Sequence, residues 1–191
     1  MITIDILTTD PFYMLKDCNC ITIGKRAGVF NKVPDTTTIE LYADRKDYYK
    51  KCFLAEHSTI EVLEFRIVDD CARGDVINQI ARATKGLPRF QVQSSRPDWN
   101  SGAKRKPSDE TYVKFSSVWN PLSFMQMARQ RLCTNAQKET REWVQQVINC
   151  MQNSNEPFFN ALAECCMPMC RYRGNICYEL KPCGKCERGI I

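Results

Sequence analysis

The sequence predicts an α+β fold in which an antiparallel sheet is packed with helices. Apolar and polar residues alternate in residues 1–9 and again in 62–68, which is typical of strands with one buried face. Residues 121–166 instead carry apolar side chains at helical spacing, interrupted by short polar breaks. Together the two patterns indicate half-buried antiparallel strands combined with several helices.

The N-terminal third gives one strand, one helix and a turn. Residues 10–44 are mixed, contain Cys18 and Cys20, and predict no element. The strand, the helix and the polar turn are expected at residues 1–9, 45–54 and 55–61. The turn holds His57, the only histidine, so any mechanism that needs a histidine base must use it.

The central strand is expected at residues 62–68, where the side chains divide cleanly between two faces. Its apolar face is Leu63, Phe65 and Ile67, and its polar face is Glu64 and Arg66. Asp69 and Asp70 are expected to end it. A helix over residues 72–84 should follow.

The C-terminal half predicts a loop, a strand and three helices. Asn120-Pro121 is a strong helix start, because asparagine caps a helix and proline suits its first position. The first helix begins there; the loop, the strand and the two later helices are expected at residues 97–108, 111–119, 136–151 and 158–166. From residue 167 the chain reads as loop, rich in cysteine, glycine and proline.

Composition limits the classes of protein this can be. At 191 residues the chain suits one main domain, and its net charge of +5 suits a small anionic ligand without demanding nucleic acid. No apolar run approaches the ~20 residues that span a bilayer, and the alternating, early-acidic N-terminus does not resemble a signal peptide. We therefore expect a cytoplasmic protein without membrane contact, whose 12 cysteines read as metal ligands before disulfides.

The stretch from residue 77 to residue 99 has the clearest ligand-binding chemistry. Gln79 and Arg82 share one helical face, and beyond the break at residues 86–88 Ser94 and Arg96 share one side of an extended run. Arginine forks match phosphate oxygens, and glutamine can both donate to and accept from a base edge. If the two limbs fold together, they form a nucleotide monophosphate site; otherwise the arginines are ordinary solvated side chains.

The C-terminal cysteines suggest a metal site. Cys170, Cys177, Cys183 and Cys186 lie among glycines and a proline, and Cys183-x-x-Cys186 has the spacing of a zinc knuckle. Thiolates in this setting suit tetrahedral zinc. Free buried thiols and an iron–sulfur cluster are the alternatives.

Three blocks of residues carry a family resemblance. The first is Glu56-His57-Ser58-Thr59-Ile60-Glu61 with the strand that follows it. The second is Gln79-Ile-Ala-Arg82 with Ser94-Ser-Arg96, and the third is Asn120 through Arg131 with Ala136-Gln137-Lys138-Glu139-Thr140-Arg141. In this order the blocks resemble flavin-dependent thymidylate synthases (ThyX), of the short type found in phages and some anaerobic bacteria.

The sequence also departs from the family pattern. The family's Arg-His-Arg triplet reads Arg82-Ala83-Thr84, and Leu122 stands where the family has an arginine. The spacing from His57 to Glu61 is one residue short, and the connection that ends at Asn120 is much shorter than usual.

The resemblance implies a thymidylate synthase-complementing-like fold and a defined reaction. In the family, FAD passes hydride to a one-carbon unit that methylenetetrahydrofolate donates to carbon 5 of dUMP, with NADPH as reductant and without an attacking enzyme cysteine. Family members are homotetramers whose sites combine residues from several chains. A related pyrimidine deoxynucleotide modification is the close variant.

The resemblance also implies roles for individual residues. Gln79, Arg82, Ser94 and Arg96 would hold the nucleotide, and Arg131 would contact the pyrimidine and stabilise charge developing on it. The flavin residues would be His57, Thr59, Glu61, Asn120 and Gln126. The implied zinc ligands are Cys133, Cys170, Cys177 and Cys183, with Cys186 as the substitute.

The expected organisation is a ThyX-like α+β domain at residues 1–166 and a Cys-rich, metal-bound tail at 167–191, joined by zinc to Cys133. Two alternatives to an enzyme remain. One is a catalytically inactive protein on the same scaffold that binds nucleotides or nucleic acid. The basic run at residues 104–106 would contribute to that binding; the alternative is that it is an ordinary solvated loop. The other is an interaction protein that keeps only the metal-bound fold.

Overall fold

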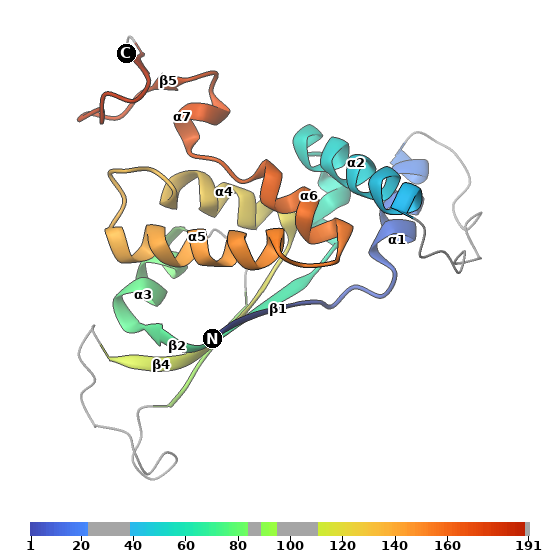
Figure 1. The fold of residues 1–191 in the computed structure, drawn as a ribbon, viewed down its shortest axis with the longest axis horizontal. Coiled ribbons are helices and arrows are strands. Elements are labelled where there is room, and N and C mark those ends of the chain that lie inside the picture. Colours follow the sequence, from blue (N-terminus) through green and yellow to red (C-terminus); the bar gives the residue numbers. More distant parts are fainter. Residues whose placement is uncertain (23–38, 84–88, 95–110, 190–191) are drawn as a thin grey trace.

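The computed structural model describes residues 1–22, 39–83, 89–94 and 111–189. Its centre is a four-stranded antiparallel sheet in the order β1-β2-β4-β3 (Figure 1). The strands are β1 (Ile2–Ile6), β2 (Phe65–Arg73), β3 (Arg89–Val92) and β4 (Tyr112–Trp119). The predicted α+β class with an antiparallel sheet is confirmed.

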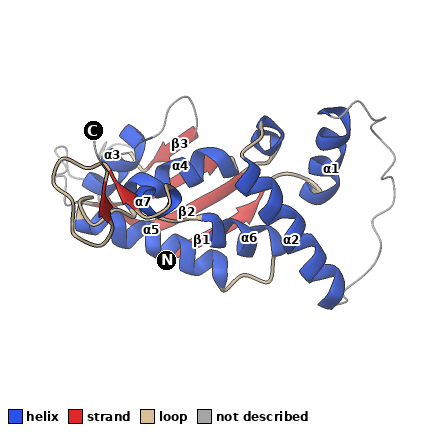
Figure 2. Cartoon of the chain, turned by 90° about the horizontal axis from the view of Figure 1, so that it is seen from above, coloured by secondary structure: helices blue, strands red, loops and turns tan. Residues whose placement is uncertain are grey.

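The helices lie mainly over one face of the sheet and beyond one end of it (Figures 1 and 2). They are α1 (Pro11–Thr22), α2 (Ile39–Ala55), the 3-10 turn η1 (Ser58–Val62), α3 (Gly74–Ala83), α4 (Pro121–Arg131), α5 (Lys138–Gln152) and α6 (Pro157–Cys165). Figures 1 and 2 show α4, α5 and α6 covering the sheet, with α2 beside α6. A short helix α7 (Met169–Tyr172) and a parallel pair, β5 (Ile176–Cys177) and β6 (Glu187–Arg188), end the described chain.

The alternation in β2 sets which face is buried. Leu63, Phe65 and Ile67 are fully buried under the helices, whereas Arg66 is exposed on the opposite face. Arg66 pairs with Asp5 directly across the sheet at 2.9 Å, in the register that joins β1 to β2. Strand alternation read from sequence therefore predicts the buried face correctly.

The predicted boundaries of this strand are wrong at both ends. Residues 58–62 form η1, and β2 continues past Asp69 and Asp70 to Arg73 through an irregularity opposite β4. Asp69 does not end the strand because its buried carboxylate is satisfied: Oδ2 accepts from Trp143 Nε1 at 2.9 Å and Oδ1 from the Cys71 N–H at 3.0 Å. Helix α3 consequently begins at Gly74, two residues later than expected.

The remaining elements follow the prediction in part. Asn120 caps α4, its Oδ1 accepting from the Ser123 N–H at 2.8 Å, with Pro121 at the first helical position. Helix α1 lies in the stretch that predicted no element, and α7, β5 and β6 lie where only loop was expected. The break at residues 86–88, the loop at 97–108 and Arg96 fall outside the described residues.

Aromatic side chains make the centre of the core. The ring of Phe158 on α6 meets those of Phe65, Phe53 and Tyr49 at centroid distances of 6.0, 5.6 and 5.4 Å, mostly edge to face. Trp119 at the end of β4 packs likewise on Phe124 of α4 at 5.5 Å. These contacts join the sheet to α2, α4 and α6.

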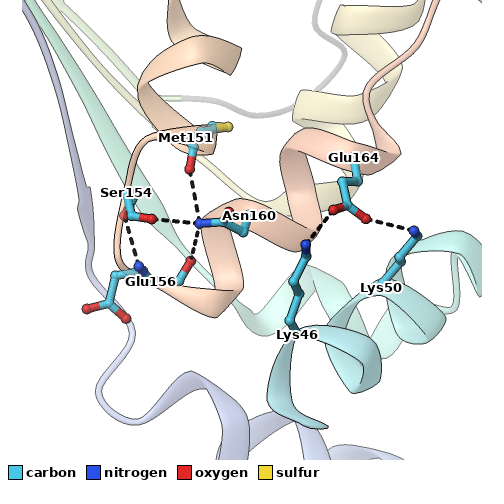
Figure 3. A network of polar contacts seen from close by, with 7 residues as sticks. All are labelled: Lys46, Lys50, Met151, Ser154, Glu156, Asn160 and Glu164. Atoms are coloured by element: carbon cyan, nitrogen blue, oxygen red, sulfur yellow. Dashed lines mark hydrogen bonds and ion pairs between the residues drawn. The ribbon is translucent and has the colours of Figure 1, made fainter. Parts of the chain in front are cut away.

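Polar contacts fix α6 at both ends (Figure 3). Before the helix, the Asn160 amide donates to the carbonyl of Ser154 at 2.7 Å and to those of Met151 and Glu156. Farther along, Glu164 pairs with Lys46 and Lys50 of α2 at 2.5 and 2.7 Å.

Across the described residues, no helix is both long and apolar enough to pass through a membrane.

Candidate functional site

Helices α3 and α4 bring two of the predicted arginines together. Arg131 is the last residue of α4, and its Nη2 donates to the backbone carbonyl of Gln79 on α3 at 2.7 Å. Partial burial, and secondly the nearby charge of Arg82, lower the pKa of the Arg131 guanidinium. The Arg131 Nε is buried and has no hydrogen-bond partner among the described residues.

This arrangement is suited to an anion. Neither Arg82 nor Arg131 forms an ion pair with any residue that the structure describes. The charge of Arg82, whose side chain is exposed, disfavours the positive charge on Arg131, and a bound phosphate or an electron-rich ring would offset that repulsion. The simpler role of Arg131, compensation of the helix dipole at the end of α4, is compatible with this one.

The polar residues of the Ala136–Arg141 block hold this site in position. Gln137 Nε2 donates to Asp75 at 2.8 Å, and Arg73 donates to the same carboxylate at 2.8 Å. Arg73 first, and Gln137 with it, lower the pKa of Asp75. Arg141 Nη1 donates to the carbonyls of Thr134 and Ala136, both at 3.1 Å. These bonds fix α3 against α5 and brace the loop that follows Arg131.

The predicted flavin residues lie elsewhere along α4. Asn120 caps the start of α4 and Arg131 ends it, so the two stand about 16 Å apart for a helix of 11 residues. Turn η1 packs against α4, with Thr59 buried and the side chains of His57 and Glu61 exposed. Gln126 is exposed on α4 itself. The candidate residues of one chain thus form two groups along α4.

The other predicted nucleotide residues are placed less fully. Gln79 meets Arg131 through its backbone carbonyl. Ser94 is half-buried two residues beyond the end of β3, and Arg96 is outside the described residues.

A buried ion pair near the site was missed by sequence reasoning. Arg129, with 6% of its side chain exposed, pairs with Glu56 through both carboxylate oxygens. The ring of Tyr172 on α7 covers the same guanidinium, 3.6 Å from its centroid. Arg129 and Arg131 stand within one helical turn, yet Arg129 forms a buried ion pair whereas Arg131 bonds the Gln79 carbonyl and lies near the charge of Arg82.

The predicted zinc site is not assembled. Within the described residues, no three or more His, Cys, Asp or Glu side chains are grouped so that they could hold a metal ion. Cys177 is buried, Cys133 and Cys170 are half-buried, and Cys183 is exposed. The tail nevertheless contacts the loop after Arg131, because the Cys183 thiol is hydrogen-bonded to Thr134.

A cavity of about 410 Å³ opens away from these residues, between β2 and the start of α5. Asp69, Arg73, Tyr112, Glu139 and Trp143 are among its lining residues, and none of the predicted site residues is. Asp69 and Arg73 are committed to Trp143 and to Asp75, so these two polar side chains of the cavity serve the fold.

Comparison with solved structures shows which known fold the chain has. Neither a family model nor a curated protein sequence matches the chain. Among solved structures, a UMP/dUMP methylase PolB from Streptomyces cacaoi bound with 5-Br dUMP is similar at a TM-score of 0.56 and 12% identity, over 86% of this chain and 95% of that one. The flavin-dependent thymidylate synthase ThyX from Helicobacter pylori, complexed with FAD and dUMP, gives 0.55 and 11% over 86% and 99%. The chain therefore has a divergent ThyX-like fold.

Proposed function

We propose that this protein binds a pyrimidine deoxynucleotide monophosphate at Arg82 and Arg131 and, with a flavin, transfers a one-carbon unit to carbon 5 of dUMP. The approach of these two arginines across α3 and α4 is the observation that carries the proposal. The ThyX-like fold supports it, because both similar solved proteins are dUMP-binding by their descriptions.

The arginines would divide the work on the nucleotide. Arg82, together with Arg96, would hold the phosphate through charge-assisted hydrogen bonds, with Gln79 and Ser94 as further contacts. Arg131 would face the pyrimidine, where its unpartnered Nε could donate to an oxygen as negative charge develops on the ring. Its bond to the Gln79 carbonyl would keep the guanidinium oriented.

The residues around η1 are compatible with FAD. His57, Glu61 and Gln126 are exposed, Thr59 lies between the first two, and the Asn120 cap uses Oδ1, which leaves Nδ2 to donate. The flavin would supply the hydride that reduces the transferred carbon, with NADPH as reductant and methylenetetrahydrofolate as donor. Because Asn120 and Arg131 lie at opposite ends of α4, we propose that a homotetramer joins the flavin residues of one chain to the nucleotide residues of another.

The test is ligand binding with a matched arginine control. At a dUMP concentration 100 times the Kd, binding should stabilise the protein by about 2.7 kcal/mol, seen as a higher melting temperature. Arg131→Ala should remove the shift, whereas Arg66→Ala on the exposed face of the sheet should keep it. Purified protein should be yellow with bound FAD. No shift with dUMP in the wild type would refute the nucleotide site.

A second candidate is a protein that binds the nucleotide without turnover. Ala83 follows Arg82 where the family has a histidine, so one polar contact of the site is missing. This candidate predicts a melting shift with dUMP from a colourless protein that forms no thymidylate. Salt-sensitive binding of DNA or RNA would instead indicate a nucleic-acid-binding role. Formation of thymidylate would exclude both.

A further inference from the structure

The C-terminal segment, residues 169–189, has too little apolar packing to explain how it is held. Of its residues only Cys177 is buried, and Tyr172, Tyr178 and Leu180 are 45%, 44% and 86% exposed. Its regular structure is one turn of helix and a pair of strands of two residues each. Segments this small normally need a disulfide or a metal.

Backbone pairing brings the cysteines of this segment toward one another. The N–H of Glu187 donates to the Asn175 carbonyl at 3.0 Å and that of Gly189 to the Cys177 carbonyl at 2.8 Å. Cys186 therefore stands beside the strand that holds Cys177. Its thiol is hydrogen-bonded to that of Cys170 and interacts electrostatically with those of Cys183 and Cys177. Cys133 is not among these partners.

The turn between Cys183 and Cys186 contains a glycine that its backbone conformation favours. Gly184 has φ +78°, a left-handed conformation that favours glycine. The turn lets the backbone at Lys185 hydrogen-bond to the Cys183 sulfur, which also bonds Thr134.

The charge of the segment also suits a metal–thiolate centre. Four thiolates around a divalent ion leave a net charge of −2. Between Met169 and Gly189 the chain carries five cationic residues and two acidic ones; the cations are Arg171, Arg173, Lys181, Lys185 and Arg188. This excess of positive charge would stabilise the centre.

We propose that Cys170, Cys177, Cys183 and Cys186 bind one zinc ion in a tetrahedral, all-thiolate site. This set replaces Cys133 of the sequence-based expectation with Cys186. Because no group of the described residues is arranged to ligate an ion, the thiols must close on the metal by side-chain rotation to Zn–S distances of about 2.3 Å. The site does not depend on the proposed nucleotide function.

Zinc there would fasten the segment beside the candidate site. Asn135 Nδ2 donates to the Lys181 carbonyl at 2.7 Å, and Thr134 bonds the Cys183 thiol. Both residues belong to the loop that follows Arg131. A closed metal site would therefore hold this loop, in addition to the bonds from Arg141.

Metal analysis of the full chain, purified under reducing conditions, tests the proposal. We expect about one zinc per chain, and Co²⁺ in its place should give the charge-transfer and visible bands of tetrahedral sulfur coordination. Cys186→Ser and Cys177→Ser should lose most of the zinc. Cys133→Ser, the matched control, should retain it.

Several results would overturn the site. One is a wild-type protein that binds neither zinc nor cobalt, and another is zinc loss in Cys133→Ser with zinc retained in Cys186→Ser. The purified protein could also contain iron and sulfide instead of zinc, or have a mass that shows disulfides between the tail cysteines. The wild-type cobalt spectrum decides independently of whether any variant folds. As a further readout, chelation should speed tryptic cleavage after Arg171, Arg173 and Lys181, while the melting of the remaining protein should change little.

Discussion

Two regions of this protein differ in how much apolar surface they bury. The body, which comprises the four-stranded sheet and α1 to α6, surrounds a continuous aromatic and aliphatic core. The tail, which comprises α7, β5 and β6, buries only Cys177. The body should thus resist reductants and chelators, whereas the order of the tail should depend on the state of its thiols. The comparison separates apolar burial from the proposed metal ligation as sources of stability.

The two regions meet at a small number of contacts. Tyr172 of the tail stacks on Arg129 of the body, and Lys181 accepts a hydrogen bond from Asn135. Both body residues belong to, or directly follow, the helix that carries Arg131. The state of the tail can therefore reach the candidate site through the end of α4.

The largest expected difference between the regions is in the core. Phe158→Ala should lower the free energy of unfolding by about 3–5 kcal/mol, because it empties the contacts with Phe53 and Phe159. Tyr178→Ala in the tail, where the ring is 44% exposed, should cost under about 1 kcal/mol. Urea denaturation of both variants measures the difference; similar losses would mean that the tail belongs to the cooperative core.

The buried ion pair should give the next largest effect. Glu56→Ala leaves the Arg129 guanidinium buried and unpaired, and should cost about 3 kcal/mol. The control is Glu142→Gln, which removes an exposed helix pair with Lys138 and should cost under about 0.5 kcal/mol. Equal losses in thermal or urea unfolding would contradict the burial argument.

The junction of the two regions should give a smaller effect. Tyr172→Ala removes the ring that covers Arg129 and should destabilise the body by about 1 kcal/mol. Tyr172→Phe keeps the ring and should behave as the wild type. If neither substitution changes the free energy of unfolding in urea, the tail does not stabilise the body through this contact.

The pH dependence of the α2–α6 ion pairs should be the smallest effect. Lys46 first, and Lys50 with it, hold the pKa of Glu164 below its ordinary 4.5. The unfolded state therefore binds the proton first, so the stabilisation is present above pH 4.5 and is lost as pH falls through the lower folded pKa. Glu164 is about a third exposed, so the loss should stay under about 1 kcal/mol. Glu164→Gln should flatten this part of a stability–pH profile; an unchanged slope would refute the assignment.

Sequence signals that act within a few residues, such as helix capping and proline geometry, predicted an element correctly where they agreed with each other. Asn120-Pro121 began a helix as expected, because capping and proline geometry act within a few residues. The end of β2 was mispredicted because the partner that satisfies Asp69 is Trp143, 74 positions later in the chain. No local pattern reports such a partner.

The candidate site divides in the same way. The spacing of Gln79 and Arg82 on one helix, and the choice of Arg131 on another, were available before the structure. That Gln79 supplies its backbone carbonyl rather than its amide to Arg131 was not, since every residue has a carbonyl and only packing selects one. The choice of Cys186 over Cys133 likewise depends on the pairing of β5 with β6.

By itself the sequence determined the α+β class, the buried face of the central strand, the start of α4 and the arginines that are candidates for ligand binding. Only the tertiary structure decided that Arg129 is buried against Glu56 and Tyr172 while Arg131, two positions away, bonds the Gln79 carbonyl near the charge of Arg82. The reason is physical: hydrophobic period and capping depend on neighbours along the chain, whereas the environment of a charge depends on which distant segments displace its water.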